Sequence, residues 1–136
     1  MRWECIGDLI PARMQRRPEV LQLRLHHLMR KKHWPRALSV SRLLCRVAPD
    51  NAVGFLHAGF CLHQLGRTED AKALLTRGPI ALLKDPIYYY NMGCYDALLG
   101  NVSEAEANLR ISFKMDASFR DLARKDPDLQ ALHGVI

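Results

Sequence analysis

The sequence lacks the features that would assign the chain to a membrane or a secretory class. It contains no uninterrupted apolar run of about 18 residues, the length that a helix needs to cross a bilayer. Residues 1–17 hold no continuous apolar core and no small-residue cleavage site, so a secretory signal is not expected. We therefore expect a cytoplasmic protein that does not enter a membrane.

Cysteine is scarce and irregularly placed. The four cysteines, Cys5, Cys45, Cys61 and Cys94, show no paired spacing and lie among apolar residues. Free thiols in a reducing compartment fit this pattern, and a disulfide framework is the alternative. His57 and Cys61 have a spacing that a metal could bridge, but no second cluster of Cys and His ligands accompanies them. No metal and no cofactor are expected.

No motif typical of an enzyme is present. Four glycines, Gly59, Gly66, Gly93 and Gly100, lie at predicted helix contacts and turns, so they form no phosphate-binding loop. Cys94 could be drawn as a nucleophile with a histidine as its base on the neighbouring helix. A thiol packed among aromatic side chains is the interpretation that we prefer. We expect no catalytic residues.

Positive charge is concentrated in the first part of the chain. Residues 1–50 hold 11 Lys and Arg against 4 Asp and Glu, whereas residues 51–136 hold 9 against 10. Such an asymmetry can indicate a surface for a polyanion or simply a solvated face.

What the chain does have is an internal period of 34 residues. The stretch 52–85 matches residues 18–51 and 86–119 when it is shifted by 34. The residues that fall in phase are Ala37 with Ala71 and Ala105, Gly59 with Gly93, Gly66 with Gly100, and Phe55 with Tyr89. A fixed period of this length indicates a repeat architecture.

The residue types at this period resemble the tetratricopeptide repeat (TPR), a helix–turn–helix unit of 34 residues. The middle copy carries the match at Phe55, Ala58, Gly59, Leu62, Gly66, Ala71, Leu75 and Gly78, with Leu83 where the family prefers proline. The resemblance implies an all-α fold, a right-handed α-solenoid of three repeats in a single domain. The expected boundaries are an N-terminal cap at 1–17, repeats at 18–51, 52–85 and 86–119, and a C-terminal cap at 120–136.

Local signals place the helices within each copy. The first copy predicts helices at about residues 19–31 and 35–47, and the second predicts helices at 52–65 and from residue 69. We expect Thr68 to cap the latter helix, and Ser103 with Glu106 to form a capping box in the third copy. Asp85 is the expected N-cap before Pro86, whereas Gly78-Pro79 predicts a break in the second helix of the middle copy. Asp96, where the family prefers tyrosine, is expected either to pair with an Arg or Lys or to mark a looser contact.

The resemblance also implies a concave groove lined by the first helix of every repeat. In this sequence the groove positions are mostly apolar in the second and third copies. They are Gln22, His26, Met29, Val53, Leu56, Phe60, His63, Ile87, Tyr90, Asn91 and Cys94. An apolar stripe of this kind suits a short partner segment with hydrophobic anchors, bound extended or as a helix. The alternative is that the C-terminal cap or another subunit covers it.

We therefore predict a non-enzymatic protein-interaction module. Nucleic-acid or other polyanion binding through the basic first half is the alternative, with a basic patch at Arg30, Lys31, Lys32 and Arg36. Three repeats in a small chain further resemble the chaperones of type III secretion that shield translocator proteins; the similar residues are the stretch from Gln64 to Ala71 and the stretch from Ser103 to Leu109. Self-association through an uncovered repeat end is a third possibility.

Overall fold

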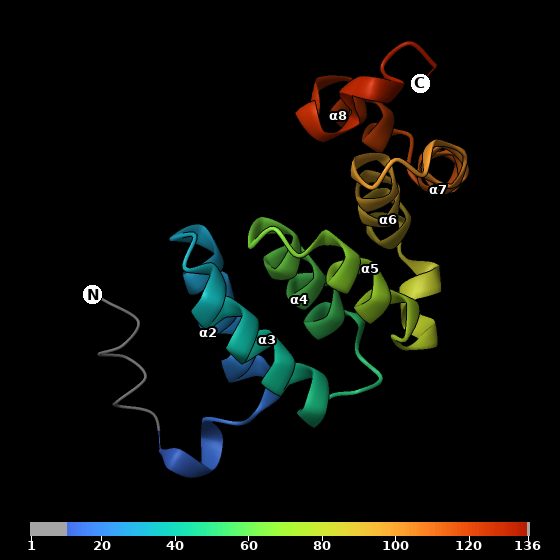
Figure 1. The fold of residues 1–136 in the computed structure, drawn as a ribbon. Coiled ribbons are helices and arrows are strands. Elements are labelled where there is room, and N and C mark those ends of the chain that lie inside the picture. The colour runs from blue at the N-terminus through green and yellow to red at the C-terminus, as the bar shows by residue number, and fades with distance from the viewer. Residues whose placement is uncertain (1–10, 136) are drawn as a thin grey trace.

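The computed structural model describes residues 11–135, and every regular element in that range is a helix (Figure 1). The predicted cap at 1–17 lies largely outside the described residues. In chain order the elements are η1 (Ala12–Met14), α2 (Pro18–Arg30), α3 (Trp34–Val47), α4 (Ala52–Gln64), α5 (Thr68–Thr76), η2 (Ile80–Lys84), α6 (Pro86–Leu98), α7 (Val102–Met115), α8 (Ser118–Lys125) and η3 (Pro127–Leu132), where η denotes a 3₁₀ helix. Each helix from α2 to α7 packs on the next, as the colour sequence in Figure 1 shows. The predicted all-α class is confirmed.

The 34-residue period is visible in the backbone, because the same turn joins the two helices in each of the three copies. Lys32, Gly66 and Gly100 end the first helix of each copy in the left-handed conformation, with φ of 58°, 79° and 83°. In each turn the next residue donates its backbone N–H to a carbonyl five residues earlier; the pairs are His33 to Leu28, Arg67 to Leu62 and Asn101 to Asp96. This hydrogen bond and the left-handed residue together define a Schellman motif. The first copy therefore keeps the turn although a lysine replaces the glycine.

The two helices of a repeat touch most closely at small residues. Ala37, Ala71 and Ala105 are all fully buried, as their shared phase predicts. A Cβ added to Gly93 would lie 2.7 Å from Cγ of Leu109, so this position in α6 has no room for a side chain. Close contact at these positions fixes the spacing within each pair and lets the leucines of neighbouring helices form one core.

Two of the predicted helix caps are wrong. The N-caps of α5 and α7 are Arg67 and Asn101, one residue before Thr68 and two before Ser103. The reason is the short link: the residue that closes the Schellman turn must also begin the next helix. The Asp85 cap is confirmed, since its carboxylate accepts a hydrogen bond of 3.0 Å from the backbone N–H of Ile87.

The predicted break at Gly78-Pro79 is confirmed. Helix α5 ends at Thr76, and η2 starts after Pro79. A Cβ on Gly78 would clash with Leu82, whose side chain is buried in the core. The glycine thus leaves room for the side chain of Leu82, through which η2 joins the core.

After α7 the chain turns back toward α6. Helix α8 buries only Ala123, and η3 buries Leu129 and Leu132. Because η3 packs on α6, residues 127–132 lie beside the first helix of the third repeat. Figure 1 shows α8 and the C-terminal end of the chain at the α6–α7 end of the molecule. None of the described helices is both long and apolar enough to span a bilayer.

Candidate partner-binding groove

The predicted groove residues lie on α2, α4 and α6, and they differ in how accessible they are. His26 and Ile87 are exposed, and Gln22, Met29, Val53, Phe60, His63 and Asn91 are half-buried. Leu56, Tyr90 and Cys94 are buried. The surface that remains accessible therefore runs mainly over the first and second repeats, and the third repeat contributes mostly its edge.

In the first two repeats the groove residues are tied to the core by sulfur and aromatic contacts. The Sγ–H of Cys61 donates to Sδ of Met29 at 3.4 Å. The ring of Phe60 meets the ring of Trp34 edge to face, with centroids 5.6 Å apart. The predicted set of groove residues omitted Trp34, because it lies at the start of the second helix of its repeat.

The third-repeat part of the groove is covered by the chain itself. Tyr90 Oη–H donates a hydrogen bond of 2.6 Å to the carboxylate of Asp126, and Cys94 Sγ lies 3.9 Å from the same oxygen. Nε2 of His63 lies 3.2 Å from the carboxylate of Asp128. The sequence left open whether the C-terminal cap would cover the apolar stripe, and the structure shows that it covers this part.

The electrostatics of this covered part disfavour ionisation of its thiol and phenol groups. Burial raises the pKa of the Cys94 thiol, and the carboxylates of Asp126 and Asp128 raise it further. Burial and the hydrogen bond to Asp126 raise the pKa of the Tyr90 phenol. Both groups are therefore neutral at physiological pH, where they act as hydrogen-bond donors.

Cys94 and His63 do not form a nucleophile–base pair. The two ring nitrogens of His63 have other partners, since Nδ1 lies 3.0 Å from the Thr68 hydroxyl and Nε2 contacts Asp128. A thiol whose pKa is raised by burial and by a neighbouring carboxylate is a poor nucleophile. Within residues 11–135 no group of three or more His, Cys, Asp or Glu side chains could hold a metal ion.

The basic patch is a contiguous exposed turn. Arg30, Lys31, Lys32 and Arg36 are all exposed where α2 passes into α3. Lys32 holds the left-handed conformation that glycine holds in the other two copies. In sequence the patch begins directly after Met29, the last of the predicted groove residues on α2.

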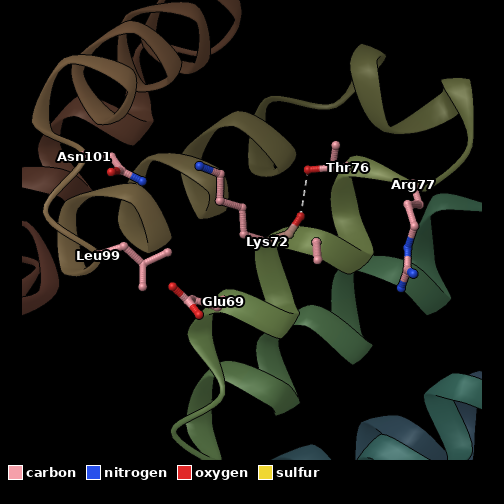
Figure 2. Close-up of a pocket in the computed structure, with 7 residues that line it drawn as sticks. Glu69, Lys72, Thr76, Arg77, Leu99 and Asn101 are labelled. Atoms are coloured by element: carbon pink, nitrogen blue, oxygen red, sulfur yellow. Dashed lines mark hydrogen bonds between the residues drawn. The ribbon is translucent and has the colours of Figure 1, made fainter.

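A second hollow lies outside the predicted groove, between α5 and the turn that joins α6 to α7 (Figure 2). Its volume is about 520 Å³, and its walls are Glu69, Lys72, Ala73, Thr76, Arg77, Leu99 and Asn101. Lys72 reaches across to the buried Asp96 on α6, with Nζ 2.5 Å from Oδ1. Of the two alternatives for Asp96, the structure therefore supports pairing with a lysine.

The fold matches a solved structure with a bound partner. The crystal structure of PcrH in complex with the chaperone binding region of PopB superposes with a TM-score of 0.65, covering 86% of this chain and 89% of that chain. The chain has the fold of PcrH. PcrH is a TPR-type chaperone of type III secretion, so the predicted tetratricopeptide-repeat fold is confirmed. Sequence identity to PcrH is 23%, so the likeness to PcrH establishes the fold alone.

The family is not evident from sequence matching. No protein-family model matches this chain, and no curated protein matches it either. This chain departs from the tetratricopeptide pattern at Asp96 and at the Gly78-Pro79 break, and Lys32 stands where its other two copies have glycine.

Proposed function

We propose that this chain is a non-enzymatic, chaperone-like interaction module of the cytoplasm. Its partner is a short, partly hydrophobic protein segment bound on the groove face of α2, α4 and α6. The observation that carries the proposal is the match to PcrH, whose crystal structure holds the chaperone binding region of PopB. The free thiols of Cys45, Cys61 and Cys94 agree with a reducing compartment.

The accessible groove residues support a hydrophobic segment as the ligand. Met29, Val53, Phe60 and Ile87 present apolar surface along three successive first helices. Asn91 adds an amide that can bond the backbone of an extended ligand. Apolar anchors spaced along a groove favour a peptide over a small molecule or a nucleic acid.

Two substitutions test the groove. Val53 and Ile87 lie in the first turns of α4 and α6, where an acidic side chain is favoured by the helix dipole. Val53→Glu with Ile87→Glu should abolish capture of a partner in a pull-down while circular dichroism stays unchanged. Ile80→Glu is the matched control, because Ile80 is apolar, 76% exposed and outside the groove.

The washing conditions distinguish the alternative function. A protein partner retained at high salt by the wild type and by the control, but lost from the double variant, supports the groove. Nucleic acid retained only at low salt by all three proteins would instead support the basic patch, since phosphate contacts weaken steeply with salt. Polyanion binding is retained as the second candidate function because Arg30, Lys31 and Lys32 are exposed.

A further inference from the structure

The segment from Asp126 to Leu132 lies on three residues of the predicted groove. Its first carboxylate contacts Tyr90 and Cys94 on α6, and its second carboxylate contacts His63 on α4. The segment therefore bridges the second and third repeats. It occupies the face on which a partner segment is proposed to bind.

The contacts follow a short pattern in the sequence. Two carboxylates, Asp126 and Asp128, precede two leucines, Leu129 and Leu132, whose side chains are fully buried. Asp126 also accepts a hydrogen bond of 3.0 Å from the backbone N–H of Asp128, which holds the start of η3 in shape. The carboxylates thus orient the segment through hydrogen bonds and the leucines anchor it by burial, as in a bound peptide.

The leucines of the segment are buried, but the helix before it and one of its polar contacts are open to water. Helix α8, which precedes it, buries only Ala123 and leaves Leu122 half exposed. The side chain of Asp128 is 40% exposed, so water reaches its contact with His63. Beneath it, the hydroxyl of Tyr95 is buried and has no hydrogen-bond partner among the described residues. A short 3₁₀ segment that follows a largely exposed helix opens locally more readily than the middle of a core helix.

We propose that residues 126–132 occupy the groove as an internal substitute for a partner segment. A partner displaces them by supplying two carboxylates and two leucine-sized side chains in the same order. The covalent link gives the internal segment a high effective concentration, so only a matching or stronger segment replaces it. This inference rests on the proposed function, because it names the chemistry of the ligand and how access to the site is regulated.

Hydrogen exchange of the full chain tests whether the segment opens by itself. The backbone amides of residues 128–135 should exchange faster than those in the middle of α4 and α6. The double variant Asp126→Ala/Asp128→Ala should raise exchange in the segment and leave α2 and α3 unchanged, which also shows that the variant is folded. Asp121→Ala is the matched control, since Asp121 is an exposed carboxylate that pairs with Arg124 on the same helix.

A peptide of residues 124–135 tests whether the groove accepts the segment in trans. The labelled peptide should bind the full-length double variant at least about tenfold more tightly than it binds the wild type or Asp121→Ala, because the internal competitor is weakened. A peptide with both aspartates changed to alanine should lose this binding.

Three results would overturn the inference. The segment exchanges no faster than the middle of α6, or the peptide binds none of the proteins, or it binds all of them equally. These experiments need only the chain itself. A pull-down that recovers no partner would contradict the proposed function. It would not change the hydrogen-exchange and peptide-binding results for the C-terminal segment.

Discussion

Lys72 on α5 and Asp96 on α6 form an ion pair that joins the second repeat to the third. Asp96 is 1% exposed, and its carboxylate also accepts hydrogen bonds from the side-chain amides of Asn101 and Asn108. The lysine side chain is 32% exposed, so one end of the pair reaches water. The TPR pattern prefers a tyrosine at this position, whose ring would be stabilised mainly by apolar packing. The buried carboxylate of Asp96 is instead stabilised by three donors that come from two repeats.

Removal of either partner should therefore have unequal effects. Lys72→Ala should lower the free energy of unfolding by about 1–2 kcal/mol, because two amides and water still solvate the carboxylate. Asp96→Ala should cost about 3 kcal/mol, since it leaves a cavity and two half-buried amides without their acceptor. Urea unfolding of both variants and of the double variant measures the coupling. Equal losses for the two single variants would contradict this account.

The left-handed turn residues provide a second prediction. Lys32 holds φ of 58° where the other copies have glycine, and a side chain in that conformation costs roughly 1 kcal/mol. Lys32→Gly should raise the free energy of unfolding by up to about 1 kcal/mol, and Gly66→Ala should lower it by about the same amount. Thermal melts of the two variants check the opposite signs. Lys31→Gly, one residue earlier at a right-handed position, is the control and should not stabilise.

Some features of the fold follow from the sequence because they depend on local chemistry that repeats. The 34-residue period predicted where the helices lie. Gly78-Pro79 predicted the break after α5, and Asp85-Pro86 predicted the N-cap of α6. The predicted Thr68 and Ser103 caps are wrong because the links are short: Arg67 and Asn101, which close the left-handed turns, must also begin the next helices. A propensity rule does not contain that tertiary constraint.

The candidate site could be predicted less completely. The phase of the repeat indicates which helix face holds Tyr90, Cys94 and His63. It does not indicate where the chain after α7 turns, since that depends on how Leu129 and Leu132 find space against α6. The pattern of two aspartates and two leucines was visible, but its contact with the groove is a property of the folded chain. The groove residues themselves remain a prediction until a partner is found.

Glycines in contact with the partner helix give a third prediction. A Cβ on Gly93 would lie 2.7 Å from Leu109, whereas one on Gly59 would lie 3.3 Å from Leu75. Alanine gains about 1 kcal/mol of helix propensity at either position. At Gly93 the clash should outweigh this gain, for a net loss of about 1–2 kcal/mol. At Gly59 the two effects should nearly cancel. Chemical denaturation of both alanine variants checks the contrast, and a larger loss at Gly59 would contradict it.

The last prediction concerns pH. Burial, and then the charge of nearby His26, lower the pKa of His57 below its ordinary value of 6.5. In the unfolded chain His57 takes up a proton near pH 6.5, but in the folded chain it does so only at lower pH, so protonation favours unfolding. The contribution of His57 to stability is therefore complete above pH 6.5 and declines as the pH falls through the window below it. The comparison is made with His57→Gln, whose side chain stays neutral at every pH. Urea unfolding at pH 7.5 and 5.5 should show a smaller loss of stability on acidification for the variant than for the wild type. An equal loss in both proteins would mean that His57 titrates alike in the folded and unfolded chains.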